Sequence, residues 1–371
     1  ALQLSGLNIT DYHQPGGDII NKCILIDNAM LPMEKIIPKP NEQLVEKWIK
    51  MALDIIVSKG ITNIHDAWQN KTTIDTIIKL IENNKFPIRC YGMLGASHAP
   101  LLEKYFNEGH YISSKFVIRS VKAFIDGALG SRGAALFEPY SDDKNNCGLT
   151  LISYEDFIEL AQQCKKFGFQ LCTHAIGDRG NSMVLDIYSD VIHNMPNHRW
   201  RIEHAQMVKE EDITRFKQYD ILPSMQPTHC TSDMRWMNHR IGENRIHRIS
   251  RWQSFIDAGC KIPGGSDCPI EDGNPLFEYY AAITRKDHTG YPNKGWQPQE
   301  CVNRINALKM LTSWAAYGEF SENKRGKIKV GFDADLTVIS NDITTCDSKD
   351  ILKTDIIMTI VEGDIVYNNN K

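Results

Sequence analysis

The middle of the chain repeats one pattern, in which a segment with the 3.6-residue hydrophobic period of a helix precedes a short apolar run. The segment Asn41–Lys59, for example, places Leu44, Trp48, Ala52 and Ile55 on one helical face. Further helices are predicted over 72–83, 154–167, 178–192, 210–216, 252–258 and 303–316. The apolar runs predict strands over 61–65, 88–94, 116–124, 169–174, 200–204, 221–226 and 262–267.

Strands that alternate with helices predict right-handed βαβ units and a parallel sheet, so the fold class is α/β. None of the apolar runs is followed by the glycine-rich loop of a nucleotide-binding doubly wound sheet. Polar residues gather instead where the strands end, which is where (β/α)₈ barrels keep their chemistry. The pattern therefore predicts a (β/α)₈ TIM barrel over residues 1–320 in which one strand, the first, is missing.

After Phe320 the pattern changes to alternation with period two. Lys324–Ser340 and Met358–Tyr367 are predicted to be β-strands, with glycines between them. We expect residues 321–371 to form the C-terminal part of a small β-sandwich appendage.

Composition excludes several classes of protein. Lys+Arg is 42 and Asp+Glu is 46, a net charge of −4, which offers no basic surface for nucleic acid. No apolar run is long enough to span a membrane. The ten cysteines contain no C-x-x-C pair, a usage that leans towards reduced thiols in the cytoplasm, although the sequence does not fix the compartment. A small-molecule substrate is the expected partner, and a homo-oligomer is left open.

Four residues at predicted strand ends carry the candidate chemistry: Lys122, His174, His204 and Asp267. Taken singly, each histidine could be a core residue, Asp267 a loop cap and Lys122 a side chain that reaches out to solvent. Because all four fall at the same end of successive units, the joint pattern favours a functional site. Two histidines and a carboxylate suit a divalent metal ion.

Several separate motifs carry a resemblance to a known family. They are VKAFIDGALGSRGA (121–134), THAIGDRG (173–180), RIEHAQ (201–206), MQPTH (225–229), GGSDCP (264–269) and GFDADLTV (331–338). In this order they resemble the amidohydrolase superfamily, in its branch of YtcJ-like and N-substituted-formamide-deformylase-like enzymes. The resemblance extends along nearly the whole chain.

The resemblance implies that carbon dioxide carboxylates Lys122 and that the product bridges two divalent metal ions, with zinc as the first choice. His174 and His204 would bind one ion, and Asp267 would bind the other and act as general base. His229 and Arg245 lie where this branch places substrate-facing residues. Metal-activated water and an aspartate base agree with general hydrolytic chemistry.

The His-x-His pair that the family carries on its first strand occurs nowhere in the 371 residues. Residues 1–23 resemble the excursion that follows that strand. We therefore expect the first strand to lie upstream of Ala1, and the remaining ligands to hold at most one metal ion, weakly.

The favoured function is hydrolysis of a non-peptide C–N bond in a small amide, formamide or cyclic amide. Three alternatives stay open: a metal-dependent esterase or lactonase, a Schiff-base aldolase that uses Lys122, and a barrel retained for binding or regulation without catalysis. His65 and Asp66 also end a predicted strand, and we expect their role to be structural.

Overall fold

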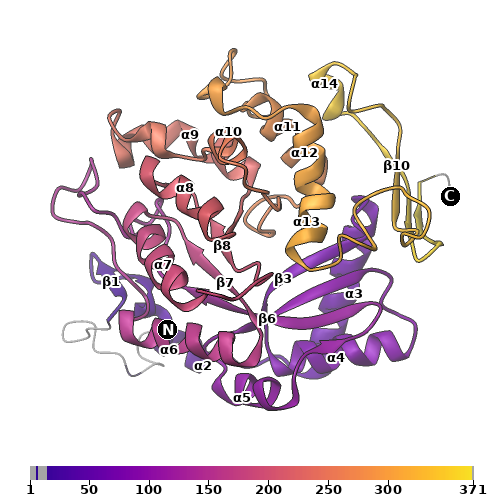
Figure 1. Cartoon of the computed structure of the whole chain (residues 1–371), viewed down its shortest axis with the longest axis horizontal. Coiled ribbons are helices and arrows are strands. Elements are labelled where there is room, and N and C mark those ends of the chain that lie inside the picture. Colours follow the sequence, from indigo (N-terminus) through magenta and orange to yellow (C-terminus); the bar gives the residue numbers. More distant parts are fainter. Residues whose placement is uncertain (1–5, 7–14, 370–371) are drawn as a thin grey trace.

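A computed structural model describes residue 6 and residues 15–369, and at its centre lies a curled parallel sheet (Figure 1). The strands pair in chain order, and each pair along this path is parallel. They are β3 (Asn63–Gln69), β4 (Arg89–Gly95), β6 (Phe116–Phe124), β7 (Gln170–Ala175), β8 (Arg201–His204) and β9 (Leu222–Ser224). A two-residue strand, β5 (Tyr111–Ile112), adds to β6 in the antiparallel sense.

Helices between these strands cover the outer face of the sheet (Figure 1): α4 (Lys71–Glu82), α5 (Ala99–Glu108), α6 (Tyr154–Phe167), α7 (Asp178–Val191) and α8 (Glu210–Gln218). Helix α6 has the predicted bounds because Ser153 caps its first turn and Gly168, at φ 75°, ends it. The main core lies between the sheet and these helices and includes Phe116, Phe157 and Trp200, all fully buried. No helix among the described residues combines the length and the apolar character needed to cross a bilayer.

The position after β9 is occupied by a single contact rather than by a strand. Met225 and Gly264 form an isolated parallel bridge, so the strand predicted over 262–267 shrinks to one residue pair. Pro263 has no N–H to donate and Gly264 and Gly265 have little tendency to form strands, which explains the difference. Within the described residues β3 pairs with β4 alone, so the sheet is a half-barrel with one open side. This confirms the predicted α/β barrel class with a strand position vacant.

Other helices and a hairpin precede the sheet or follow it. Before it come a hairpin of β1 (Gly17–Ile20) and β2 (Ile24–Asp27), then α2 (Leu31–Ile36) and α3 (Glu42–Ser58). After it come α9 (Pro227–Ile241), α10 (Trp252–Asp257), α11 (Pro275–Thr284), α12 (Arg304–Leu311) and α13 (Ser313–Gly318). The sequence analysis did not predict α9 and α11, because α11 is apolar nearly all round and α9 has no clear apolar stripe.

Helix α3 forms where predicted but presents a different face to the core. Val45, Leu53 and Val57 are buried, whereas Leu44 and Trp48 on the neighbouring face are 39% and 51% exposed. The periodicity identified the helix, and a second apolar stripe on the same helix obscured which face packs inward.

The C-terminal strands form an antiparallel sheet of β10 (Leu336–Ile339), β11 (Ile356–Val361) and β12 (Asp364–Asn368), with α14 (Ser348–Ile351) between β10 and β11. The strand predicted over Lys324–Ser340 begins only at Leu336, because Gly326 and Gly331 adopt positive φ and interrupt it. The sheet packs on α3, where the hydroxyl of Thr359 donates to the carbonyl of Val57 at 2.7 Å. The domain boundary near residue 320 stays a prediction.

The end of the barrel opposite the strand C-termini is closed by the segment after α13. Glu319, whose side chain is 4% exposed, lies 3.3 Å from His65 and accepts a hydrogen bond from Asn63 at 2.8 Å. Arg201 donates to Nδ1 of His65 at 3.0 Å, so Nε2 of His65 carries the proton that faces Glu319. His65 therefore has a structural contact at this end of the barrel.

We expect Glu319→Gln to destabilise the protein in a pH-dependent way. Burial acts to raise the pKa of this carboxyl group, but hydrogen bonds from His65, Ser321 and Asn63 outweigh it and hold the pKa at about 2. Because the ordinary value is 4.5, the stabilisation is fully present above pH 4.5 and is lost as the pH falls towards 2. Urea unfolding at pH 7 should show a loss of about 2–4 kcal/mol.

The difference from wild type should shrink as the pH of the unfolding experiment is lowered to 3. The matched control is Glu108→Gln, since Glu108 is 63% exposed and pairs loosely with Lys104. Such a surface pair contributes about 0–1 kcal/mol. Equal effects of the two substitutions at pH 7 would contradict the assignment.

Candidate metal centre

The candidate residues meet at the mouth formed by the C-terminal ends of the strands. In the sheet register Phe124 pairs with His174, and His174 pairs with Glu203, so these residues form one row across β6, β7 and β8. Lys122 lies two residues before Phe124 and therefore on the same side of its strand. The row brings side chains from separate strands to one level of the barrel.

His204 reaches the same space by a local change of backbone conformation. Successive strand residues normally face opposite sides of a sheet, so Glu203 and His204 would point apart. His204 has φ 76° at the last position of β8, and its ring lies 4.6 Å from that of His174. Its Nδ1 lies 2.8 Å from the side-chain oxygen of Gln226, which fixes the ring orientation and leaves Nε2 as the other ring nitrogen.

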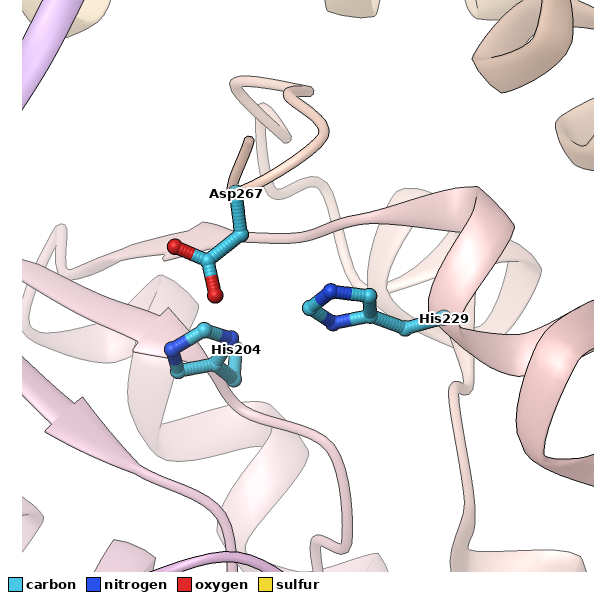
Figure 2. Close-up of side chains that lie close together, drawn as sticks. All are labelled: His204, His229 and Asp267. Carbon is cyan, nitrogen blue, oxygen red and sulfur yellow. The ribbon is translucent and has the colours of Figure 1, made fainter. Parts of the chain in front are cut away.

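Three side chains come close enough to share one cation (Figure 2). Ligand atoms of His204, His229 and Asp267 all lie within 4.8 Å of one another. His229 belongs to the first turn of α9, and Asp267 lies in the loop after the Gly264 bridge at φ 54°. The Nε2 atom of His229 is buried and has no hydrogen-bond partner within the described part of the chain. An orphaned imidazole nitrogen beside a carboxylate fits a metal ligand.

Burial keeps the three imidazoles of the site neutral. It lowers the pKa of His174 to about 3, with the charge of Lys122 acting in the same direction. Burial also lowers the pKa of His229 to about 4 and that of His204 well below its ordinary value. Neutral imidazoles offer a lone pair at physiological pH, which a metal ligand requires.

The carboxylate of Asp126 lies directly behind His174. It is fully buried and accepts hydrogen bonds from the backbone N–H groups of Ala135, Ile176 and Gly177. Its oxygen lies 3.6 Å from Nε2 of His174, and the carbonyl of Gly127 lies 3.3 Å from the same nitrogen. These acceptors engage Nε2 of His174 and leave Nδ1 as the other ring nitrogen.

Lys122 is buried beneath the mouth with two carboxylates in its electrostatic field. Burial lowers the pKa of its amine to about 8, although Glu203 and Asp267 both act to raise it. Its Nζ lies 3.9 Å from the centroid of the Phe124 ring. An amine with this pKa has an appreciable neutral fraction at mildly alkaline pH.

Glu203 and Asp126 are the acidic residues that the sequence analysis did not single out. Glu203 is buried, and its Oε1 lies 3.3 Å from Nε of Arg201 without forming a hydrogen bond within the described residues. Both residues stand inside recognised motifs, RIEHAQ and VKAFIDG, beside residues that were selected. Strand parity would have placed Glu203 inside the barrel, because it is two residues from inward-facing Arg201.

The hydrogen bonds of Arg245 do not place it at the barrel mouth. Its guanidinium donates to the carbonyls of Ile241, Glu138 and Pro139 at 2.7–3.0 Å, so it joins the end of α9 to the loop after β6. A substrate contact by Arg245 stays a prediction. His229, by contrast, joins the His204 and Asp267 cluster, where the resemblance had implied only a substrate-facing position.

Comparison with known proteins places this geometry in a family. The sequence profile of the Amidohydrolase family matches residues 10–367. The chain belongs to the amidohydrolase family. This confirms the resemblance to the amidohydrolases, and the candidate metal-binding cluster lies at the barrel mouth of this family member.

Comparison with individual proteins points to the same family. This amidohydrolase is 29% identical over 383 residues to "Putative amidohydrolase YtcJ" from Bacillus subtilis (strain 168), covering 100% of this chain and 71% of the relative. It is 26% identical over 251 residues to "N-substituted formamide deformylase" from Arthrobacter pascens, covering 67% of this chain and 45% of the relative. An uncharacterised metal-dependent hydrolase from Pyrococcus horikoshii OT3 shares the fold, with a TM-score of 0.74 and 24% identity over 90% of this chain and 66% of the neighbour.

Proposed function

We propose that this amidohydrolase hydrolyses a non-peptide C–N bond in a small amide, formamide or cyclic amide. The observation that carries the proposal is the convergence of His204, His229 and Asp267 at the barrel mouth. The similarity to a protein named N-substituted formamide deformylase supports an amide-type bond. An esterase or lactonase would use the same ligands and differ only in its leaving group.

The residues of the cluster suit one divalent cation of the zinc, iron or manganese type. When bound, such an ion would supply Lewis acidity to a carbonyl oxygen and ionise water near neutral pH. His204 and His229 would hold it as neutral donors, with Gln226 fixing the ring of His204. His174 lies beside His204 as a further nitrogen donor for the same ion or a second one.

Asp267 is proposed to move the proton in the reaction. Burial raises the pKa of its carboxyl group, Lys122 lowers it and Glu203 raises it. A carboxylate in this position accepts a proton from the attacking water and delivers it to the leaving nitrogen. Whether the Asp267 carboxyl group is ionised therefore depends on nearby positive charge such as that of Lys122.

Lys122 is proposed to react with carbon dioxide to form a carbamate that completes the ligand set. Carboxylation requires the neutral amine, which burial among Val121, Ala123 and Phe124 favours. The carbamate would turn a cation into an anion next to Glu203 and Asp267, so a metal ion must compensate the added negative charge.

Metal analysis of the purified chain with a panel of amides, formamides and lactones tests the proposal. We expect about one equivalent of divalent metal per chain, hydrolysis of at least one amide, and loss of metal in His229→Ala. The fall in metal affinity of His229→Ala should exceed the roughly 10- to 100-fold change that follows when a residue next to a metal ligand is replaced.

His239 provides the matched control, because it lies on the same helix and is exposed. His239→Ala should retain metal and activity. Equal metal content in His229→Ala and wild type would remove His229 from the ligand set. Metal-loaded protein that cleaves lactones and no amide would favour the esterase or lactonase alternative.

A further inference from the structure

A β-bulge in β3 turns a tryptophan into the barrel mouth. Asp66 pairs with Gly92, and Gln69 pairs with Leu94. Between these two pairs β3 therefore contains one residue more than β4. The extra residue lets the consecutive side chains of Ala67 and Trp68 both face the interior. Bulges commonly redirect a side chain in this way near functional sites.

The position of Trp68 depends on the absence of a side chain at Gly95. A Cβ atom at Gly95 would lie 2.7 Å from the indole ring, so only glycine lets the ring lie against β4. Gly95 pairs with Lys122 in the sheet register. The indole therefore lies at the level of the candidate metal centre.

Phe124 continues this aromatic surface towards the ligands. Its ring centroid lies 5.3 Å from that of Trp68 and 5.0 Å from that of His174, with tilted planes. His174 in turn lies 4.6 Å from His204. Phe124 is nevertheless 38% exposed at the end of β6, although the four residues before it on the strand are buried.

We propose that Trp68 and Phe124 form an aromatic wall that binds an aryl group attached to the carbonyl carbon of the substrate. The inference rests on the proposed function and specifies its substrate class as aryl amides. A ring held against the wall would lie beside His174, whose ring is 4.6 Å from that of His204, so its carbonyl group would face the His204, His229 and Asp267 cluster. Offset and edge-to-face contacts with two tilted rings favour an aryl group over an alkyl group of equal size.

Equilibrium binding of three neutral amides tests the wall without requiring turnover. Benzamide, cyclohexanecarboxamide and acetamide are titrated into the intact chain, with and without zinc, and followed by saturation-transfer NMR. We expect benzamide to bind more tightly than cyclohexanecarboxamide. Trp68→Leu and Phe124→Leu should each weaken benzamide binding by roughly 2- to 10-fold and leave acetamide binding unchanged.

Trp48→Leu is the matched control, because Trp48 is 51% exposed on α3. It should bind all three amides like wild type, and Trp68→Phe should retain most of the aryl preference. Thermal unfolding verifies that each variant is folded. Equal binding of benzamide and cyclohexanecarboxamide by wild type, or equal benzamide affinity in folded Trp68→Leu and wild type, would overturn the wall.

The two proposals fail in different ways. An aryl preference that depends on Trp68, in a chain that hydrolyses none of the compounds, supports the wall and counts against the proposed hydrolysis. Amide hydrolysis without any preference for aryl groups in binding would support the proposed hydrolysis and contradict the aromatic wall.

Discussion

Replacement of Asp267 with asparagine is expected to lower kcat by ~100-fold or more while the chain stays folded. The carboxylate of Asp267 shares the ligand cluster with His204 and His229. An amide preserves the shape of the side chain but cannot accept the proton of the attacking water. The measurement is steady-state hydrolysis of an amide that the substrate panel identifies, with metal content and circular dichroism determined on the same sample.

Asp272→Asn is the control for this substitution. Asp272 lies five residues further along the same loop, is 57% exposed and pairs with Lys59 at 2.6 Å. Its replacement should leave kcat within about twofold of wild type, since exposed ion pairs contribute little. A metal-loaded Asp267→Asn variant with near wild-type kcat would show that the proton is taken by another group.

Lys122→Ala is expected to abolish activity and most metal binding, with partial recovery when a short carboxylic acid such as acetate or propionate is added. The added carboxylate would occupy the space of the missing carbamate and supply its oxygen ligands. Metal content, activity at increasing acetate concentration and the carbamate ¹³C signal of wild-type protein under labelled carbon dioxide are the measurements.

Lys115→Ala, at the residue just before β6, serves as the control, because Lys115 is partly exposed, donates to the carbonyl of Phe86 and lies 3.8 Å from Glu362. Full metal occupancy in Lys122→Ala would exclude a carbamate ligand. Irreversible borohydride labelling of Lys122 in the presence of a carbonyl compound would instead favour the Schiff-base aldolase.

The fold was predictable where local signals and packing agree. Helix α6 begins after the Ser153 cap and ends at Gly168, and its observed bounds match the predicted ones. The strand expected over 262–267 did not form, because Pro263 and two glycines outweigh the apolar residue Ile262. Helix α11 was missed since its apolar residues surround the helix and give no period to detect.

The site was predictable from strand ends only in part. Lys122, His174 and His204 follow from the rule that parallel strands deliver their C-terminal residues to one mouth. The role of His229 could not be derived from periodicity, because it depends on where the first turn of α9 is placed by tertiary packing. The inward orientation of Trp68 depends on a register shift that has no signature in the residue types of β3.

That register shift makes the length of β3 as important as its composition. Deleting one residue between Asp66 and Gln69 would restore regular alternation and leave a single inward position there, so the strand could present Ala67 or Trp68 to the barrel interior but not both. Loops at strand ends commonly tolerate insertions and deletions, whereas this strand interior would not. Among homologous chains, a gap of one position here would therefore mark the loss of one of the two neighbouring side chains that face the barrel interior.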